Sequence, residues 1–312
     1  MADPVPEAAD AMRAARPLLG EGALSVRRFD TGLAFFVFEV ASAAGRVVVR
    51  MGRPGQRTTL SQGVALAAQL RPLGVPLPRL LVDGTDSTLP FVILERLEGS
   101  DLGDHVAGFS PAQKRHVAEA VVAAQRALAH LGTGSRYGYA PSAGAAPHAT
   151  WPALIAASLA RSRTRLEANG LFDPACATRM ELLARQLHPR LAAIPATPFL
   201  HDTTTKNVIV TPEGRFSGIV DVDDLCFGDP RYAIALTRTA LLAHGLPADY
   251  AAIWLDLSGH EDDALMHFYT ALFVLDFMSE HGMVFNGNAR PSDKAQRARL
   301  ETLFAHTLRP LA

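Results

Sequence analysis

The sequence predicts an α+β protein in which a small antiparallel sheet comes first and a larger, mainly helical part follows. Residues 24–51 and 79–95 hold short apolar runs, many of them rich in Val and Phe, joined by short turn-forming connections, which is typical of antiparallel strands. From Ser110 onward, apolar residues recur at helical spacing over long segments. With 312 residues, 48% of them hydrophobic, the chain is long enough for one large domain or two lobes.

The first part of the chain is expected to form a sheet with helices beside it. Thr31-Gly32 is a turn between the first two strands, and Gly74 follows the end of the second helix. Residues 84–87 form the turn of a later hairpin. The predicted elements are helices over 5–19 and 57–72 and strands over 24–30, 33–41, 46–51, 79–83 and 90–95.

The second part is expected to be mostly helical. Ser110-Pro111 is an N-cap followed by a first-turn proline. Residues 132–148, rich in Gly, Ala, Ser and Pro, predict a long loop. Segment 263–281 is apolar nearly all round, so it should be buried, and Asp276 within it needs an arginine or a substrate ammonium as partner. Helices are expected over 112–131, 151–169, 173–194, 230–244, 247–257, 263–281 and 293–308.

Composition and charge exclude several classes of function. The net charge is −1 and aromatic residues make up 7%, without basic residues interleaved, so we expect no nucleic-acid partner and no membrane association. No apolar run approaches the roughly 20 residues that span a bilayer, and the first residues do not read as a signal peptide. Cys176 and Cys226 are far apart in the sequence, which favours a reduced, cytoplasmic protein.

The chemistry of the chain is concentrated between Pro198 and Ala233. His201-Asp202 and Asn207 precede a short apolar strand over 208–210, and a turn over 211–214 leads to a second strand over 216–220. Asp221, Asp223 and Asp224 follow at once. Crowded carboxylates at the end of a buried strand repel one another and resist desolvation. Mg²⁺ removes this difficulty, because it takes oxygen ligands from one or two carboxylates and leaves room for phosphate.

The spacing within this stretch is specific. Asn207 follows Asp202 after four residues, and a strand, a turn, a second strand and Asp221 come next. Kinases have the same order of catalytic base, metal-binding Asn and metal-binding Asp. The segments HDTTTKN, IVDVDD and FGDPRYAIA resemble the His-Gly-Asp-x4-Asn, Ile-Asp-Trp-Glu and Gly-Asp-Pro-x-Tyr-Asp-Leu-Ala segments of the aminoglycoside phosphotransferase/choline kinase family. The resemblance covers roughly residues 24–280 and is strongest over 199–233.

The resemblance implies a bilobal protein-kinase-like fold. It places a nucleotide-binding lobe at residues 1–98 and a catalytic and substrate-binding lobe at 99–312. It implies Asp202 as the catalytic base, Asn207 and Asp221 as ligands of Mg²⁺, and Asp223 as a ligand of a second ion or of its waters. ATP or GTP would be the co-substrate.

The resemblance also implies the nucleotide site. The turn Thr31-Gly32 would lie over the phosphates, although a plain hairpin turn is the alternative. Arg50 would bind the phosphates in a bidentate way; the alternative is an edge-strand arginine facing water. The adenine would bind main-chain atoms between Glu95 and Leu97.

The chain departs from the family pattern in two places. The family has a Glu in the helix over 57–72 that pairs with the strand cation, but this chain has no acidic residue between Glu39 and Asp83. Gln62 is a candidate partner for Arg50. His201 directly precedes Asp202, where the family has Gly. Lys206 either touches the transferred phosphoryl group or faces solvent.

The charge distribution indicates the substrate. Residues 221–281 carry 11 Asp+Glu and 2 Lys+Arg, a net charge of −9, which favours a cationic hydroxylated substrate such as an aminoglycoside-like antibiotic. A solvated acidic face explains the same block equally well, and the alternatives to an antibiotic are a metabolite kinase for a sugar, homoserine or an amino alcohol and a nucleotide-binding regulatory pseudokinase. We expect a monomer or homodimer. The candidate substrate-binding residues are Asp256, Glu261, Asp262, Asp263, Asp276 and Glu280.

Overall fold

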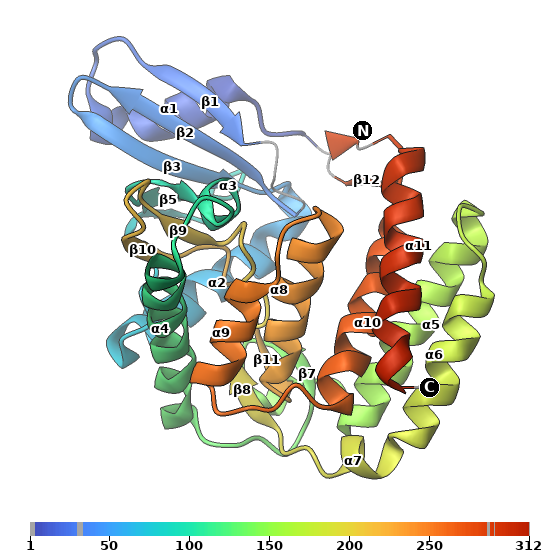
Figure 1. Cartoon of the computed structure of the whole chain (residues 1–312). Coiled ribbons are helices and arrows are strands. Elements are labelled where there is room, and N and C mark those ends of the chain that lie inside the picture. Colours follow the sequence, from blue (N-terminus) through green and yellow to red (C-terminus); the bar gives the residue numbers. More distant parts are fainter. Residues whose placement is uncertain (1–3, 30–33, 286–287, 290, 312) are drawn as a thin grey trace.

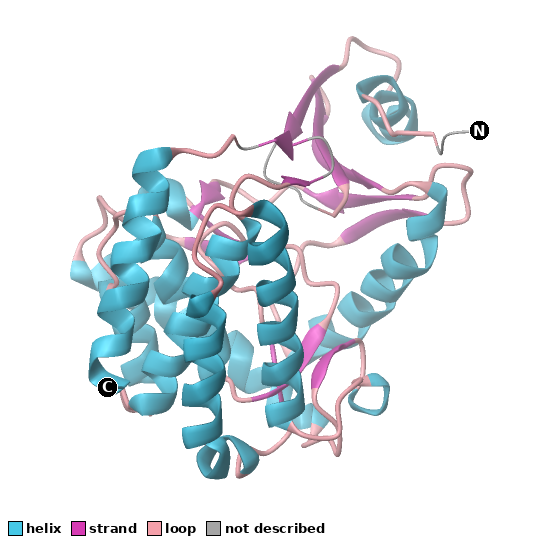
Figure 2. Ribbon diagram, turned by 90° about the vertical axis from the view of Figure 1, so that its right-hand side faces the viewer, coloured by secondary structure: helices cyan, strands magenta, loops and turns pink. Residues whose placement is uncertain are grey.

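The computed structural model describes residues 4–29, 34–285, 288–289 and 291–311. A sheet formed by β1 to β5 lies at one end of the molecule and most helices lie at the other, which confirms the predicted α+β class (Figures 1 and 2). Thr31 and Gly32 lie outside the described residues.

The strand-rich part is a five-stranded antiparallel sheet with the order β1-β2-β3-β5-β4. Strands that are neighbours in this sheet are joined by short connections, except that α2 lies between β3 and the hairpin of β4 and β5. The pattern of short apolar runs predicts these short connections. The strands are β1 (Ser25–Phe29), β2 (Phe36–Ser42), β3 (Gly45–Met51), β4 (Leu80–Gly84) and β5 (Phe91–Glu95).

Two helices accompany this sheet, α1 (Ala8–Leu19) and α2 (Arg57–Leu70). Ala11 and Ala15 of α1 pack in one core with Val47, Val49 and Met51 of β3. Because successive side chains of a strand point to opposite faces, Arg50 points to the other face of the sheet. There Leu60 of α2 packs with Val92, which is the cross-strand partner of Arg50. Alternation along β3 therefore directs Arg50 away from the α1 core.

The helical part contains the larger core of the chain. The predicted N-cap is confirmed, since the Ser110 hydroxyl accepts a hydrogen bond from the Gln113 amide. The single helix predicted over 173–194 is instead two helices, because Pro189 has no amide hydrogen to continue the first. The helices are α3 (Leu102–His105), α4 (Pro111–Ala127), α5 (Trp151–Asn169), α6 (Ala175–Gln186), α7 (His188–Ala192), α8 (Arg231–Ala243), α9 (Asp249–Leu257), α10 (Ala264–Glu280) and α11 (Lys294–Leu308). Short 3₁₀ turns are η1 (Pro54–Gln56), η2 (Arg71–Leu73), η3 (Leu128–Leu131), η4 (Ala143–Ala145) and η5 (Arg309–Leu311).

Two further three-stranded sheets lie in the second part of the chain, with the orders β10-β9-β6 and β7-β11-β8. The strand β7 lies within residues 132–148, which the sequence predicted to be loop throughout. Three residues are too few to show an alternating pattern, and β7 exists because it pairs with β11. The strands of these two sheets are β6 (Ser100–Asp101), β7 (Gly138–Ala140), β8 (Thr197–Phe199), β9 (Val208–Val210), β10 (Phe216–Ile219) and β11 (Leu225–Gly228). A separate antiparallel pair consists of β12 (Val284–Phe285) and β13 (Asn288–Ala289).

The predicted burial of segment 263–281 is confirmed by α10, which contributes twelve buried residues. Among the described residues, no helix combines the length and apolarity that crossing a membrane would require.

Candidate active site

The strands β9 and β10, which follow the predicted catalytic loop, contact the chain just before β4 and just after β5. Ser100 of β6 pairs with Val210 of β9, and the Ile219 amide donates a hydrogen bond of 2.9 Å to the Pro76 carbonyl. Gly218 has φ +155°, and a Cβ there would lie 2.7 Å from the Pro76 oxygen. Only glycine fits this close approach, so Gly218 allows β10 to lie against the segment that precedes β4.

The predicted catalytic loop is a compact turn around Asp202. The Asn207 side-chain amide donates a hydrogen bond of 2.8 Å to the Asp202 carbonyl oxygen. The Thr204 hydroxyl donates one of 3.1 Å to Asp202 Oδ1, and Lys206 Nζ lies 3.4 Å from Asp202 Oδ2. Both carboxylate oxygens of Asp202 are therefore oriented, and Lys206 contacts Asp202 in this structure.

Gln125 of α4 holds the start of this loop, a contact that the sequence did not reveal. Its side-chain oxygen accepts from the Leu200 amide and its NH₂ group donates to the Leu200 carbonyl, both at 2.9 Å. The same NH₂ group lies 3.2 Å from the Thr203 hydroxyl. A glutamine inside a helix has no sequence signature for such a role, because its partners are distant backbone atoms.

Strand pairing brings Asp221 next to Asn207. The Val220 amide donates a hydrogen bond of 2.9 Å to the Asn207 backbone carbonyl. Asp221 has φ 61° and is the one non-glycine residue with positive φ among the residues described. Such a conformation is uncommon and costs free energy, and it recurs at functional sites. The chain thus turns sharply where its predicted metal carboxylate stands.

Arg50 of β3 contacts two of the predicted metal residues. Its guanidinium donates to both carboxylate oxygens of Asp223 at 2.5 Å and to Asp221 Oδ1 at 2.7 Å. The Arg50 guanidinium carbon lies 4.1 Å from the centroid of the Phe35 ring. Burial lowers the pKa of Arg50, but the two carboxylates outweigh burial and raise it overall. Arg50 is thus a fixed cation at the site and not a solvent-facing edge arginine.

The predicted adenine-binding segment is part of the linker. Glu95 pairs with Arg79, whose Nε lies 2.9 Å from the Glu95 carboxylate. Arg96 pairs with Glu39 at 2.6 Å and also donates a hydrogen bond to the Leu97 carbonyl. The side chain of Glu95 and the Leu97 carbonyl are therefore engaged within the chain, and adenine binding by main-chain atoms of this segment stays a prediction.

His201 connects the catalytic loop to the helical part. Its ring meets the ring of Tyr139 in β7 edge to face, with centroids 4.7 Å apart. Burial lowers the pKa of His201, and its Nδ1 atom is buried without a hydrogen-bond partner. Burial also raises the pKa of Tyr139, which lies near Tyr232 and Asp276. The contact of His201 with Tyr139 therefore joins the catalytic loop to β7.

Asp276 and Glu280 are paired with arginines of α5. Asp276 accepts from the Ser162 hydroxyl at 3.0 Å and lies 3.3 Å from Arg161. Glu280 lies 2.7 Å from Arg165. The predicted acidic surface near the site is therefore a set of ion pairs in which each carboxylate already has a cationic partner.

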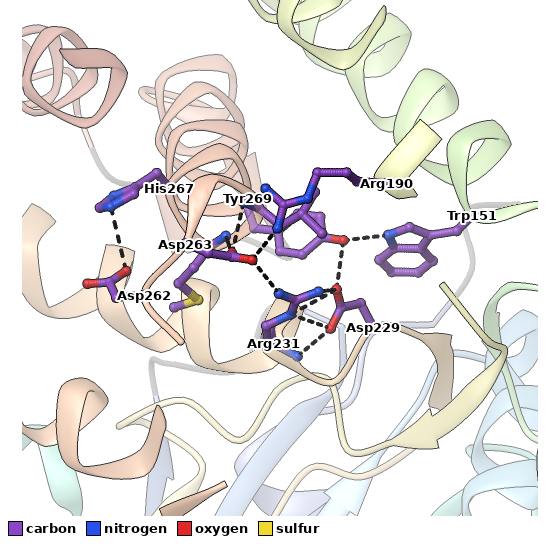
Figure 3. Close-up of polar contacts among 10 residues, drawn as sticks. Trp151, Arg190, Asp229, Arg231, Asp262, Asp263, His267 and Tyr269 are labelled. Atoms are coloured by element: carbon purple, nitrogen blue, oxygen red, sulfur yellow. Dashed lines mark hydrogen bonds and ion pairs between the residues drawn. The ribbon is translucent and has the colours of Figure 1, made fainter. Parts of the chain in front are cut away.

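Of the other candidate substrate residues, Asp263 lies at the opposite end of β11. That strand separates Asp224 at one end from Asp229 at the other, a span of roughly 13 Å for four residues. Asp229 bonds Arg231, which also pairs with Asp263 (Figure 3). The structure does not bring this group to Asp202, since the strand lies between them. Three of these candidate carboxylates have arginine partners, namely Arg115 for Asp256, Arg238 for Asp262, and Arg190 and Arg231 for Asp263. The fourth, Glu261, is exposed.

The donors beside the catalytic loop fit a hard cation. Asn207 and Asp221 are adjacent and flank the paired strands β9 and β10. They offer only oxygen ligands once the Asn207 NH₂ is engaged. The described residues contain no cluster of three or more His, Cys, Asp or Glu side chains suited to a metal. Asn207 and Asp221 would therefore hold Mg²⁺ together with ligands from a nucleotide.

The comparisons with known proteins agree on one family. The model of the phosphotransferase enzyme family (APH) matches residues 25–269. None of the curated proteins matches the sequence. Aminoglycoside phosphotransferase APH(4)-Ia, as a thermostable mutant in a ternary complex with ADP and hygromycin B, superposes with a TM-score of 0.63 at 16% identity, over 95% of this chain and 97% of that one.

Further solved structures show the same fold. The gentamicin complex of APH(2")-IIa has a TM-score of 0.62 at 13% identity, covering 99% of this chain and 97% of that one. ADP-bound APH(2'')-Ib has a TM-score of 0.61 at 14% identity, covering 95% and 96%. The predicted kinase-like fold is confirmed. With the family model matched over most of its length, the chain belongs to the phosphotransferase enzyme family.

Proposed function

We propose that this enzyme transfers the γ-phosphoryl group of ATP or GTP to a hydroxyl group of a small molecule. The observation that carries the proposal is the pair of hydrogen bonds made by Asn207. Its side chain bonds the Asp202 carbonyl and its own carbonyl accepts from Val220. These contacts gather a candidate base, an amide ligand and the carboxylate of Asp221 at one place.

Asp202 orients the acceptor hydroxyl and takes its proton late in the transfer. Thr204 and Lys206 hold the two oxygens of Asp202, so that the carboxylate meets the hydroxyl in one orientation. Bound Mg²⁺ would neutralise charge on the phosphates, and Asn207 with Asp221 would hold it. Positioning and charge neutralisation account for most catalysis of phosphoryl transfer, so losing Asp221 costs as much activity as losing Asp202.

The first candidate acceptor is an aminoglycoside-like cation. Its support is the fold shared with enzymes whose structures contain hygromycin B or gentamicin, and the acidic pair Asp276 and Glu280 on α10. A second candidate is a neutral or zwitterionic metabolite alcohol. It is favoured by the pairing of the same acids with Arg161 and Arg165, which leaves no net negative charge in that cluster.

The pseudokinase alternative is opposed by the complete set of Asp202, Asn207 and Asp221.

The cysteines Cys176 and Cys226 are free, which supports a cytoplasmic enzyme that draws on the nucleotide pool of the cell.

The function is tested by measuring the release of ADP or GDP in the presence of Mg²⁺, with aminoglycosides, sugars, homoserine and amino alcohols as acceptors. We expect turnover with at least one hydroxyl compound and its loss in Asp202→Asn. Nucleotide binding with no turnover above the Asp202→Asn background across the panel would favour the pseudokinase.

The salt dependence of the acceptor KM distinguishes the two acceptor classes. A cationic acceptor should bind more weakly as salt rises and in Asp276→Asn, because both weaken its attraction to the carboxylates. A KM that responds to neither would exclude the aminoglycoside-like acceptor.

A further inference from the structure

The cation of the strand lobe has its acidic partner in the helical lobe. We propose that Asp223 is the positioning residue for Arg50, in place of an acid on α2, and that Asp223 is not a metal ligand. This inference rests on the proposed function for its consequences in catalysis. The ion pair itself is a property of the ligand-free chain and is tested separately.

The contact between Arg50 and Asp223 has the geometry of a strong pair. Two guanidinium nitrogens meet the two carboxylate oxygens, each at 2.5 Å. The Arg50 side chain is 12% exposed and that of Asp223 is 20% exposed, so water screens the pair little. Two parallel charge-assisted bonds fix the plane of the guanidinium as well as its position. Asp221 contributes one further bond, at 2.7 Å.

The helix α2 is shaped to receive this carboxylate. Gly63 is buried on the same face as Leu60 and Leu66. A Cβ at Gly63 would lie 2.7 Å from Asp223 Oδ1, closer than side chains tolerate. Glycine at position 63 leaves room for Asp223, and Asp223 supplies the acidic partner of Arg50 that α2 lacks. Asp223 fills the space that a side chain of α2 would otherwise occupy.

The two carboxylates, Asp221 and Asp223, therefore have different roles. Both oxygens of Asp223 are used by Arg50, so Asp223 has little left to offer a cation. Asp221 makes one bond to Arg50 and sits beside Asn207. Asp221 would hold Mg²⁺ with Asn207 when nucleotide is bound, while Asp223 would keep Arg50 directed at the phosphates. The contact between Arg50 and Asp223 also joins the sheet to the segment after β10.

The first experiment needs no ligand. Thermal unfolding of Arg50→Met, Asp223→Asn and the double variant forms a double-mutant cycle. We expect each single variant to lower Tm and the double variant to lower it no further than the worse single. The matched control is Asp86→Asn, which removes a fully exposed carboxylate 3.9 Å from Arg57 and should be additive with Arg50→Met. Additive effects of Arg50→Met and Asp223→Asn would overturn the pair.

The second experiment separates positioning from metal binding. A fluorescent ATP analogue gives the Kd in a Mg²⁺ titration. We expect Asp223→Asn to raise the Kd about tenfold, as for one lost charge-assisted hydrogen bond, when Arg50 is present. With Arg50→Met already in place, Asp223→Asn should change neither the Kd nor the Mg²⁺ concentration at half-saturation. A further rise in that Mg²⁺ concentration would show that Asp223 binds metal.

The third experiment moves the acid onto α2. In Gly63→Asp with Asp223→Ala, a carboxylate returns from the helix to the space vacated beside Arg50. We expect the nucleotide Kd to return to within about threefold of the wild type, whereas Gly63→Asn with Asp223→Ala should stay as weak as Asp223→Ala alone. Equal behaviour of the Asp and Asn variants would contradict a charge-pair role. Absence of nucleotide binding in the wild type would refute the proposed function and leave the unfolding cycle to decide the pair.

Discussion

The side-chain amide of Asn207 donates a 2.8 Å hydrogen bond to the backbone carbonyl of Asp202 and so closes the catalytic loop on itself. The bond joins the residue proposed to orient the acceptor to the residue proposed to hold the metal. Displacing one end therefore displaces the other, and the four residues between them behave as a unit.

Replacing Asn207 should damage both chemistry and metal use. We expect Asn207→Ala to lower kcat by about 10²-fold or more, because a fixed electrostatic group is lost at the transferring phosphate, and to raise the Mg²⁺ concentration needed for half activity. Steady-state rates against Mg²⁺ check both. Asn169→Ala is a matched control, since the Asn169 amide also bonds a backbone carbonyl, that of Ser279 at 3.1 Å. Equal activity losses in the two variants would mean general destabilisation.

Asp202→Asn should keep nucleotide binding while losing turnover. Removing a positioned general base typically costs about 10²–10⁴-fold in rate, and the nucleotide does not need the Asp202 carboxylate. The measurement is kcat alongside the nucleotide Kd. A kcat within a few-fold of the wild type would remove Asp202 from the mechanism.

The strained backbone at Asp221 predicts a difference between two inactive variants. Asp221→Ala and Asp221→Gly both lose the carboxylate and its bond to Arg50. Only glycine adopts φ near 61° without a steric cost, so Asp221→Gly should be more stable by about 1 kcal/mol. Urea unfolding of both variants gives the comparison. Equal stabilities would show that position 221 relaxes when its side chain is removed.

The network around Asp229 should be structural. Asp229 is 3% exposed, and its carboxylate accepts from Arg231 at 2.7 Å and from the Tyr269 hydroxyl at 3.0 Å (Figure 3). Asp229→Ala leaves the Arg231 charge without this buried partner, which typically costs about 3–5 kcal/mol. Chemical unfolding measures the loss. Asp256→Asn removes a carboxylate that is 73% exposed and serves as control, with a change within about 0.5 kcal/mol.

Stability should depend on pH through Asp101. Burial, helped by nearby Asp104, raises the pKa of Asp101 from 3.8 to about 6. Between these values the folded state binds more protons than the unfolded state, so this residue makes stability fall as pH rises from about 4 to about 6. Asp101→Asn should therefore raise Tm relative to the wild type above pH 6 and change it little at pH 4. A Tm difference that is the same at both pH values would contradict the raised pKa.

The catalytic stretch was predictable because its signals are local. Asp202 and Asn207 lie on one loop, and Asn207 and Asp221 flank two paired strands, so their spacing in the sequence nearly fixes their spacing in space. The roles given to them remain predictions for the experiments above. Most long helices and the larger strands were predictable for the same reason, since amphipathic periodicity is a property of consecutive residues.

Long-range pairing was not predictable. The partner of Arg50 is 173 positions away, and the sequence pointed to Gln62 on the neighbouring helix. The strand β7 and the contact of Gln125 with Leu200 also depend on segments that meet only in the folded chain. The acidic block divides between two ends of α10, because a 17-residue helix places residues that are close in sequence about 25 Å apart.

The sequence by itself determined the fold class, the family and the order of the candidate catalytic residues, because these depend on periodicity and on motifs within short segments. The tertiary structure decided which charges neutralise one another. It pairs Arg50 with Asp223 and surrounds Asp276 and Glu280 with arginines. Ion pairing depends on distances between side chains from separate elements, and only the packed fold sets those distances.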